Sequence, residues 1–270
     1  MLSFVRMRSW SVIVSMLLFS FMVPAQELVV EGVIMGEFDY LSTDHIGRVY
    51  LAKGHELFMY SSKGDLRYQF SDLSRGVIAQ LDSRNPMKLL LFYPDYGEIT
   101  FLDNTLSRTR DNVKLSTINL ELARLACTSF DNGFWVYDPV SFRLVRFDQG
   151  LNMTNESSNI NQLVGAEIEP SQMVEQDNLL YMHDPKHGVF VFDSFGTYLK
   201  LIPIQGAVRI RARPNGLFFQ VGNKLIKYDL FNFEQTEIEL PVSDFKSVSI
   251  ETDRLFVLQK DRVVIYALSK

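Results

Sequence analysis

The sequence is poor in the residues on which most catalytic and metal sites depend. It contains one cysteine and four histidines in 270 residues, and it has no Gly-x-Ser-x-Gly, Gly-x-Gly-x-x-Gly or Walker pattern. A single cysteine cannot form an internal disulfide, so a hydrophobic core of adequate size must hold the fold together. We therefore predict no catalytic residues, no metal-binding residues and no cofactor.

Positive charge is also scarce in the chain that follows Ala25. The whole sequence has 27 Lys and Arg against 32 Asp and Glu, and two of the positive residues, Arg6 and Arg8, precede Ala25. The remainder, 26–270, is therefore acidic and contains no basic cluster. Nucleic-acid binding depends on neutralising phosphate groups, so we expect no nucleic-acid partner.

The segment 1–25 has the pattern of a secretory signal peptide. Arg6 and Arg8 precede an uncharged, mostly apolar run at 10–23, and the small residue Ala25 follows it. The alternative is a membrane anchor, but this run is shorter than the roughly 20 residues needed to span a bilayer. We predict cleavage after Ala25 and export of residues 26–270 as one domain.

Helical patterns are missing, whereas 21 Phe and 11 Tyr favour pleated, half-buried strands. One pattern recurs six times: an apolar run, a polar turn and a second run that ends on an aromatic residue or Leu. The six ends are Tyr60, Leu102, Phe147, Phe192, Tyr228 and Tyr266. Their spacing of roughly 40 residues is typical of propeller blades, whereas a β-sandwich does not require six similar copies. We predict an all-β, six-bladed β-propeller.

A polar residue directly follows five of the six ends. The five are Ser61, Asp103, Asp148, Asp193 and Asp229. A side-chain oxygen at this position can accept hydrogen bonds from nearby backbone N–H groups. We therefore expect a tight turn to the next strand after each of these residues.

The ends of the repeat predict how the ring closes. The sixth copy supplies three strands, the last over 262–267, and the strand-like segment 28–34 precedes the first copy. Pairing of this N-terminal strand with the last blade would complete its sheet and remove an exposed edge. We expect Val30 and Ile34 to be buried there.

The few titratable residues do not converge on one pattern. His183 and His187 have the spacing of a helical metal site, but they flank a Pro-containing turn between strands, so that reasoning fails. Cys127 lies in an apolar inner strand, where a buried, inert thiol is expected rather than a nucleophile. The acid pairs Glu167 with Glu169 and Asp82 with Asp95 could serve acid–base or Ca²⁺ chemistry, but solvated loop charges explain them better.

One enzymatic alternative stays open: a propeller hydrolase or lactonase that holds a cation in its central channel with acids from the innermost strands. We expect these strands at 37–41, 77–81, 123–129, 171–175, 208–212 and 247–250. They contain Arg124, Arg209 and Arg211 and no recurring carboxylate, and a cationic lining opposes a cation site.

Two resemblances to known families suggest a different role. The fourth copy, 183–199, resembles a blade of the NHL-type propellers, which mostly bind macromolecules. Segments 85–93, 99–104, 132–138 and 193–198 resemble an exported propeller family of Gram-negative bacteria that carry type IX secretion. This second resemblance implies a periplasmic, peripheral, outer-membrane-associated plug or gate of a protein translocon. Its partner would be that translocon or another cell-envelope protein, with the chain as a monomer within a larger complex and no catalytic residues.

Overall fold

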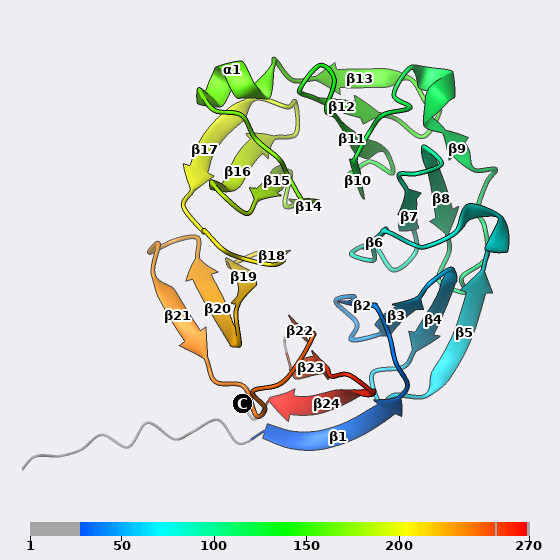
Figure 1. Ribbon diagram of the computed structural model, residues 1–270, viewed down its shortest axis with the longest axis vertical. Helices are drawn as coiled ribbons and strands as arrows, with labels where there is room; N and C mark the ends of the chain where they lie inside the picture. The colour runs from blue at the N-terminus through cyan, green and yellow to red at the C-terminus, as the bar shows by residue number, and fades with distance from the viewer. Residues whose placement is uncertain (1–27, 252, 269–270) are drawn as a thin grey trace, which may run out of the picture.

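The computed structural model describes residues 28–251 and 253–268, which form six four-stranded antiparallel sheets arranged in a ring (Figure 1). The predicted all-β, six-bladed propeller is confirmed. The predicted signal peptide at 1–25 lies outside the described residues.

Blades 1 to 5 run outward from the central axis in chain order, and blade 6 does so for its first three strands. The innermost strands of blades 1 to 6 are β2 (Tyr40–Thr43), β6 (Gln80–Asp82), β10 (Leu125–Thr128), β14 (Gln172–Gln176), β18 (Ile210–Arg213) and β22 (Ser247–Ile250). The second strands are β3 (Val49–Lys53), β7 (Leu89–Tyr93), β11 (Phe134–Asp138), β15 (Leu179–Asp184), β19 (Gly216–Val221) and β23 (Arg254–Leu258). The third strands are β4 (Glu56–Tyr60), β8 (Glu98–Leu102), β12 (Arg143–Phe147), β16 (Gly188–Asp193), β20 (Lys224–Asp229) and β24 (Arg262–Leu268). The outermost strands are β5 (Leu66–Ser71), β9 (Val113–Lys114), β13 (Met153–Glu156), β17 (Tyr198–Ile202), β21 (Gln235–Ile238) and, in blade 6, β1 (Leu28–Met35).

Helical structure among the described residues is confined to short connections between blades. These are the 3-10 turns η1 (Leu73–Arg75) and η2 (Leu115–Ile118) and the short helix α1 (Ile160–Val164). None of the helices in the described part of the chain has the length and apolar character needed to cross a bilayer.

The N-terminal strand closes the ring as expected. Strand β1 pairs antiparallel with β24 and forms the outer edge of blade 6. The expected burial is right for Ile34 but wrong for Val30, whose side chain is 55 % exposed. The register shifts between Val30 and Gly32, and this β-bulge breaks the alternation of faces, so Val30 and Ile34 point to opposite sides of the sheet.

The predicted polar turns are present after the third strands. The side-chain oxygen of Asp103 accepts hydrogen bonds from the backbone N–H groups of Thr105 and Ser107, at 2.8 and 2.9 Å. The remaining four residues, Ser61, Asp148, Asp193 and Asp229, accept backbone hydrogen bonds in the same way. The same type of turn therefore links the third strand to the fourth in five blades.

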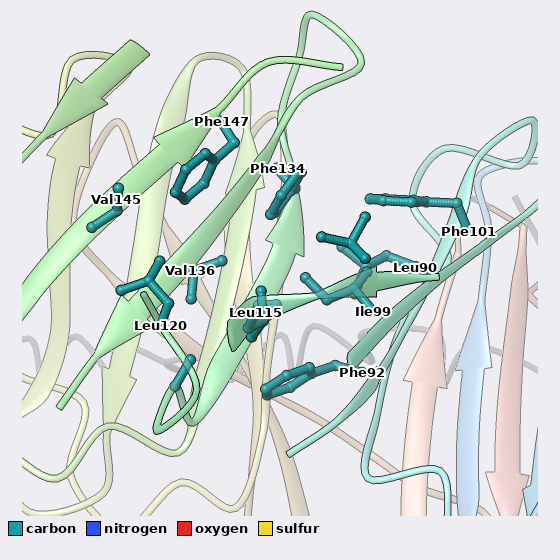
Figure 2. Packing of buried hydrophobic residues seen from close by; sticks show 13 residues of the cluster. Leu90, Phe92, Ile99, Phe101, Leu115, Leu120, Phe134, Val136, Val145 and Phe147 are labelled. Carbon is teal, nitrogen blue, oxygen red and sulfur yellow. The ribbon is translucent and has the colours of Figure 1, made fainter. Parts of the chain in front are cut away.

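The hydrophobic core lies between neighbouring blades. In the cluster between blades 2 and 3, Phe101 of β8 packs beside Phe134 of β11, and Phe134 stacks on Phe147 of β12 with ring centroids 5.3 Å apart (Figure 2). Because each cluster draws side chains from two blades, apolar burial fixes each blade against the next. The innermost strands are thereby held in a closed ring around the axis.

Candidate functional site: the central channel

The six innermost strands surround a cavity of about 190 Å³ on the central axis. Residues of every blade line it, and the described lining includes the four arginines Arg84, Arg209, Arg211 and Arg213 against one acid, Asp82. The innermost strand of every blade runs in the same direction along the central axis, so the six inner strands are parallel to one another. Their last residues therefore gather at one end of the channel.

Buried carboxylates gather at that end, contrary to the expectation of no recurring acid. Asp82 ends β6, Glu175 lies in β14 and Glu251 directly follows β22. Asp82 lies one residue beyond the predicted inner strand 77–81, Glu251 lies one residue beyond 247–250, and Glu175 is the last residue of 171–175, so the sequence pattern did not show that the three acids share one end of the channel.

Each of these carboxylates binds a neighbouring blade. Glu175 of blade 4 accepts hydrogen bonds from three donors of blade 3: the Ser129 hydroxyl at 2.8 Å, the Phe130 N–H at 2.8 Å and the Trp135 Nε1–H at 2.6 Å. Glu251 of blade 6 accepts from the hydroxyl of Thr43 in blade 1. These hydrogen bonds satisfy acids that would otherwise be costly to bury.

Asp82 joins blades 2 and 3 as part of an ion pair. It accepts hydrogen bonds from the backbone N–H and the hydroxyl of Thr128, at 2.9 and 2.7 Å, and it pairs with Arg84 at 2.9 Å. Burial alone would raise the pKa of Asp82, but the charge and hydrogen bonds of Arg84 lower it below its ordinary value. Asp82 is therefore a charged carboxylate whose oxygens are already engaged.

Blade 5 supplies the positive charge of the channel. Arg209, Arg211 and Arg213 alternate along β18 and the residue before it, so the pleat places all three on one face, while Ile210 and Ala212 are buried on the other. Arg213 pairs with Glu251 of blade 6 and donates a hydrogen bond to the Ile250 carbonyl at 3.2 Å.

Arg209 and Arg211 of blade 5 contact blade 1, which is not an adjacent blade. The Arg209 guanidinium lies 3.8 Å from the ring centroid of Tyr40, close enough for a cation–π interaction. Arg211 donates to the Thr43 carbonyl at 3.1 Å and to the Ser42 hydroxyl at 3.2 Å. Among residues 28–251 and 253–268, neither arginine forms an ion pair.

The crowding of these cations changes their proton affinity. Burial, together with the neighbouring charge of Arg211, lowers the pKa of Arg213 to about 10 despite its pairing with Glu251. Burial likewise raises the pKa of Glu251, although Arg213 and Arg211 act against that rise. Burial is the main cause in both cases, and the lowered pKa of Arg213 also reflects the neighbouring positive charge of Arg211.

The two histidines singled out from the sequence do not share a site. His183 is fully buried in β15, with its Nδ1 atom 3.1 Å from the Ser171 hydroxyl. The Nδ1 atom of His187 lies 3.1 Å from Oδ1 of Asp184, in the turn before β16. In the part of the chain that the structure describes, no three His, Cys, Asp or Glu side chains lie close enough together to hold a metal ion.

The remaining sequence candidates are separated or inert. Glu167, Glu169 and Asp95 are exposed loop residues, as expected. Asp82 is not a solvated loop charge, because it ends β6 with a buried side chain, and Asp95 lies at the opposite end of the blade. The Cys127 thiol is fully buried, and burial raises its pKa well above the ordinary value, as an inert thiol requires.

The sequence predicted Arg124, Arg209 and Arg211 in the channel lining. Arg209 and Arg211 line the cavity and Arg124 does not, whereas Arg84 and Arg213 line it without having been predicted. The alternation of arginine with Ile210 and Ala212 is the signal that could have found Arg213, because a period of two places Arg209, Arg211 and Arg213 on one face. Arg84 lies beyond the end of β6, where no strand periodicity indicates that its side chain faces the channel.

A second feature lies on the face that carries the turns between the second and third strands. Four apolar side chains there are 55 to 79 % exposed; we call them the Tyr96 patch, and they are Leu73, Val77, Tyr96 and Leu122. Their segments are neighbours: Arg75 pairs with Glu98 at 2.5 Å, and the Leu115 N–H donates to the Gly97 carbonyl at 2.8 Å. Such a group of exposed apolar side chains is typical of a protein contact surface.

No protein-family model and no curated protein matches the sequence. Similar solved structures include the Pan2 WD40 domain of Neurospora crassa, with 8 % identity, a TM-score of 0.61, and coverage of 92 % of this chain and 98 % of that one. The virginiamycin B lyase of Staphylococcus aureus has 12 % identity and a TM-score of 0.60, with 90 % and 100 % covered. BamB of Moraxella catarrhalis has 9 % identity and a TM-score of 0.50, with 90 % and 91 % covered. The chain is thus a six-bladed β-propeller that resembles the virginiamycin B lyases in fold, and propellers are a common protein-binding scaffold.

Proposed function

We propose that this protein is a periplasmic protein-binding scaffold, and more specifically a plug or gate of an outer-membrane secretion translocon of the type IX kind. The observation that carries the proposal is the Tyr96 patch, an exposed apolar surface on one face of a closed disc. The resemblance of several segments to exported propellers of type IX bacteria supports the choice of partner. BamB and the Pan2 domain support the fold alone.

The proposed mechanism is steric. Core clusters join neighbouring blades, and hydrogen bonds around the channel join them again, so the disc behaves as one rigid body. A rigid body can fill an opening and leave it when a substrate or another protein takes its place. Binding then depends on one apolar face, and no side chain needs to carry out chemistry.

The test places a charge at the centre of the Tyr96 patch. Tyr96→Asp introduces a carboxylate into a surface that an apolar partner would bury, so capture of outer-membrane protein from native membranes should fall at least about tenfold. Phe231→Asp is the matched control, because Phe231 is 76 % exposed in a turn at the opposite end of the blades. Quantitative mass spectrometry of the captured proteins measures both variants.

The outcomes separate the scaffold from its alternatives. Loss of the translocon partner in Tyr96→Asp alone supports the proposed face, whereas unchanged capture of that partner in both variants contradicts it. Equal loss in both would indicate non-specific adhesion instead of a defined contact. Circular dichroism confirms that each variant is folded before capture is compared.

A further inference from the structure

Two of the four arginines that line the channel form no ion pair with a described residue. Asp82 neutralises Arg84 and Glu251 neutralises Arg213, and these two pairs leave Arg209 and Arg211 with no acidic partner among the described residues. Both side chains are partly exposed, so a ligand in the channel can reach them. An anion bound in the channel would supply the acidic partner that Arg209 and Arg211 lack.

Donor groups are left over for such an anion. A guanidinium carries five N–H donors in a planar fork. Arg211 uses donors toward the Thr43 carbonyl and the Ser42 hydroxyl, and Arg209 contacts the face of Tyr40 with no hydrogen bond from its side chain to a described residue. Both side chains line the cavity, so their remaining N–H groups can bind a ligand within it.

We propose that the central channel is a binding site for a small oxyanion with two negative charges, carried on carboxylate or phosphate oxygens, and that Arg209 and Arg211 bind it. Arginine binds both groups through paired N–H···O hydrogen bonds. A cavity of about 150 Å³ can hold benzene, so the cavity of about 190 Å³ has room for a phosphate ion or a four-carbon dicarboxylate. This site is independent of the proposed contact face.

The surroundings favour an anion over a cation. Asp82, the single acid of the described lining, already accepts hydrogen bonds from Arg84 and Thr128. Met173, Val174 and Val248 contribute apolar walls, which strengthen electrostatic attraction by keeping the local dielectric low. A metal cation would meet four arginines here.

Calorimetry with two anionic probes and one cationic probe tests the site. Inorganic phosphate and succinate are titrated separately into the full protein at low ionic strength and pH 8, and CaCl₂ serves as the cationic probe. At least one anion should bind and raise the melting temperature, whereas Ca²⁺ should not. Binding of phosphate alone assigns a phosphate-bearing ligand, and binding of succinate alone assigns a carboxylate-bearing one.

Three variants locate the bound anion. Arg209→Gln and Arg211→Gln should each weaken binding at least about tenfold, since each removes a charged fork from the ligand. Arg124→Gln is the matched control, because Arg124 precedes an inner strand but does not line the channel. The Arg209 side chain makes no hydrogen bond to a described residue, so Arg209→Gln still tests the site if Arg211→Gln fails to fold.

Three results would overturn the proposal. The first is that neither anion binds at concentrations up to about 10 mM, the weak end of specific affinities. The second is that Arg124→Gln weakens binding as much as Arg209→Gln, which would show attraction by net charge alone. The third is that Ca²⁺ raises the melting temperature while the anions do not, which would favour a cation-dependent propeller hydrolase.

Discussion

At the scale of single residues, the buried carboxylates act as connectors between blades. A buried acid is unfavourable unless nearly all of its oxygen lone pairs accept hydrogen bonds. Glu175 meets this condition with donors from an inner strand turn, a backbone amide and an indole, all from blade 3. Removal of the carboxylate would strand three donors inside the protein.

We therefore predict a large effect of Glu175→Ala on stability. Each stranded buried donor costs about 1–3 kcal/mol, so the free energy of unfolding should fall by about 3 kcal/mol or more. The control is Glu237→Ala, which breaks an ion pair with Lys224 between two side chains that are 51 and 60 % exposed, and which should cost less than about 1 kcal/mol. Urea denaturation measures both. Equal losses of unfolding free energy in the two variants would show that Glu175 does not help to hold blades 3 and 4 together.

At the scale of elements, one turn type sets the path from the third strand to the fourth. Asp103 illustrates its chemistry: one oxygen accepts from the Thr105 N–H, the Thr105 hydroxyl and the Ser107 N–H. These bonds lower the pKa of Asp103, chiefly through the Thr105 hydroxyl. The carboxylate is thus more than a polar surface residue.

Replacement of this aspartate should weaken blade 2. Asp103→Ala removes all three acceptor contacts, and we expect the free energy of unfolding to fall by about 1–2 kcal/mol, the usual value for local hydrogen bonds to a charged group. Asp95→Ala is the control, because the Asp95 side chain is exposed in a different turn and makes no hydrogen bond to a described residue. Thermal unfolding distinguishes them, and similar melting temperatures for both variants would refute the role of Asp103.

The strands of the propeller were largely predictable because their apolar pattern is local. The third strands of blades 1 to 3 end at Tyr60, Leu102 and Phe147, as predicted. The inner strands of several blades run further than predicted, since they end on polar residues such as Thr43 and Asp82, whose partners belong to other blades. Polar residues of this kind do not resemble strand residues in a sequence pattern.

The electrostatics of the candidate site could be predicted only in part. Arg209 and Arg211 lie within the predicted inner strand 208–212, so a cationic lining was expected. Which arginines are neutralised depends on contacts such as Arg213 with Glu251 and Glu251 with Thr43, which join residues far apart in the chain. Only the closed ring brings them together.

At the scale of the whole molecule, β1 is the closing element, and its removal should be costly. Deletion of residues 28–35 strips the outer strand from blade 6 and removes Ile34, which is 4 % exposed and packs with Phe38, Val263 and Ile265. Burial of Ile34 alone contributes about 1.5–3 kcal/mol, and the unpaired β24 edge adds to the loss. The melting temperature should fall by many degrees.

Val30→Ala is the control for the deletion, because Val30 points into solvent beside the bulge. It should leave the melting temperature nearly unchanged. If the protein without residues 28–35 melted where the complete chain does, β1 would contribute nothing to closure.

The pairing of β1 with β24 also sets the order in which the protein can fold. Leu28 pairs with Leu268, so β1 can meet its partner strand only after the residues up to Leu268 have been synthesised. Blades 1 to 5 consist of strands consecutive in the chain and can form early, whereas blade 6 requires the closure of a loop that spans all the others. Blade 6 is therefore the last blade to assemble. We expect the finished ring to open first at the pairing of β1 with β24, so the backbone amides of blade 6 should exchange with solvent sooner than those of blades 2 to 4.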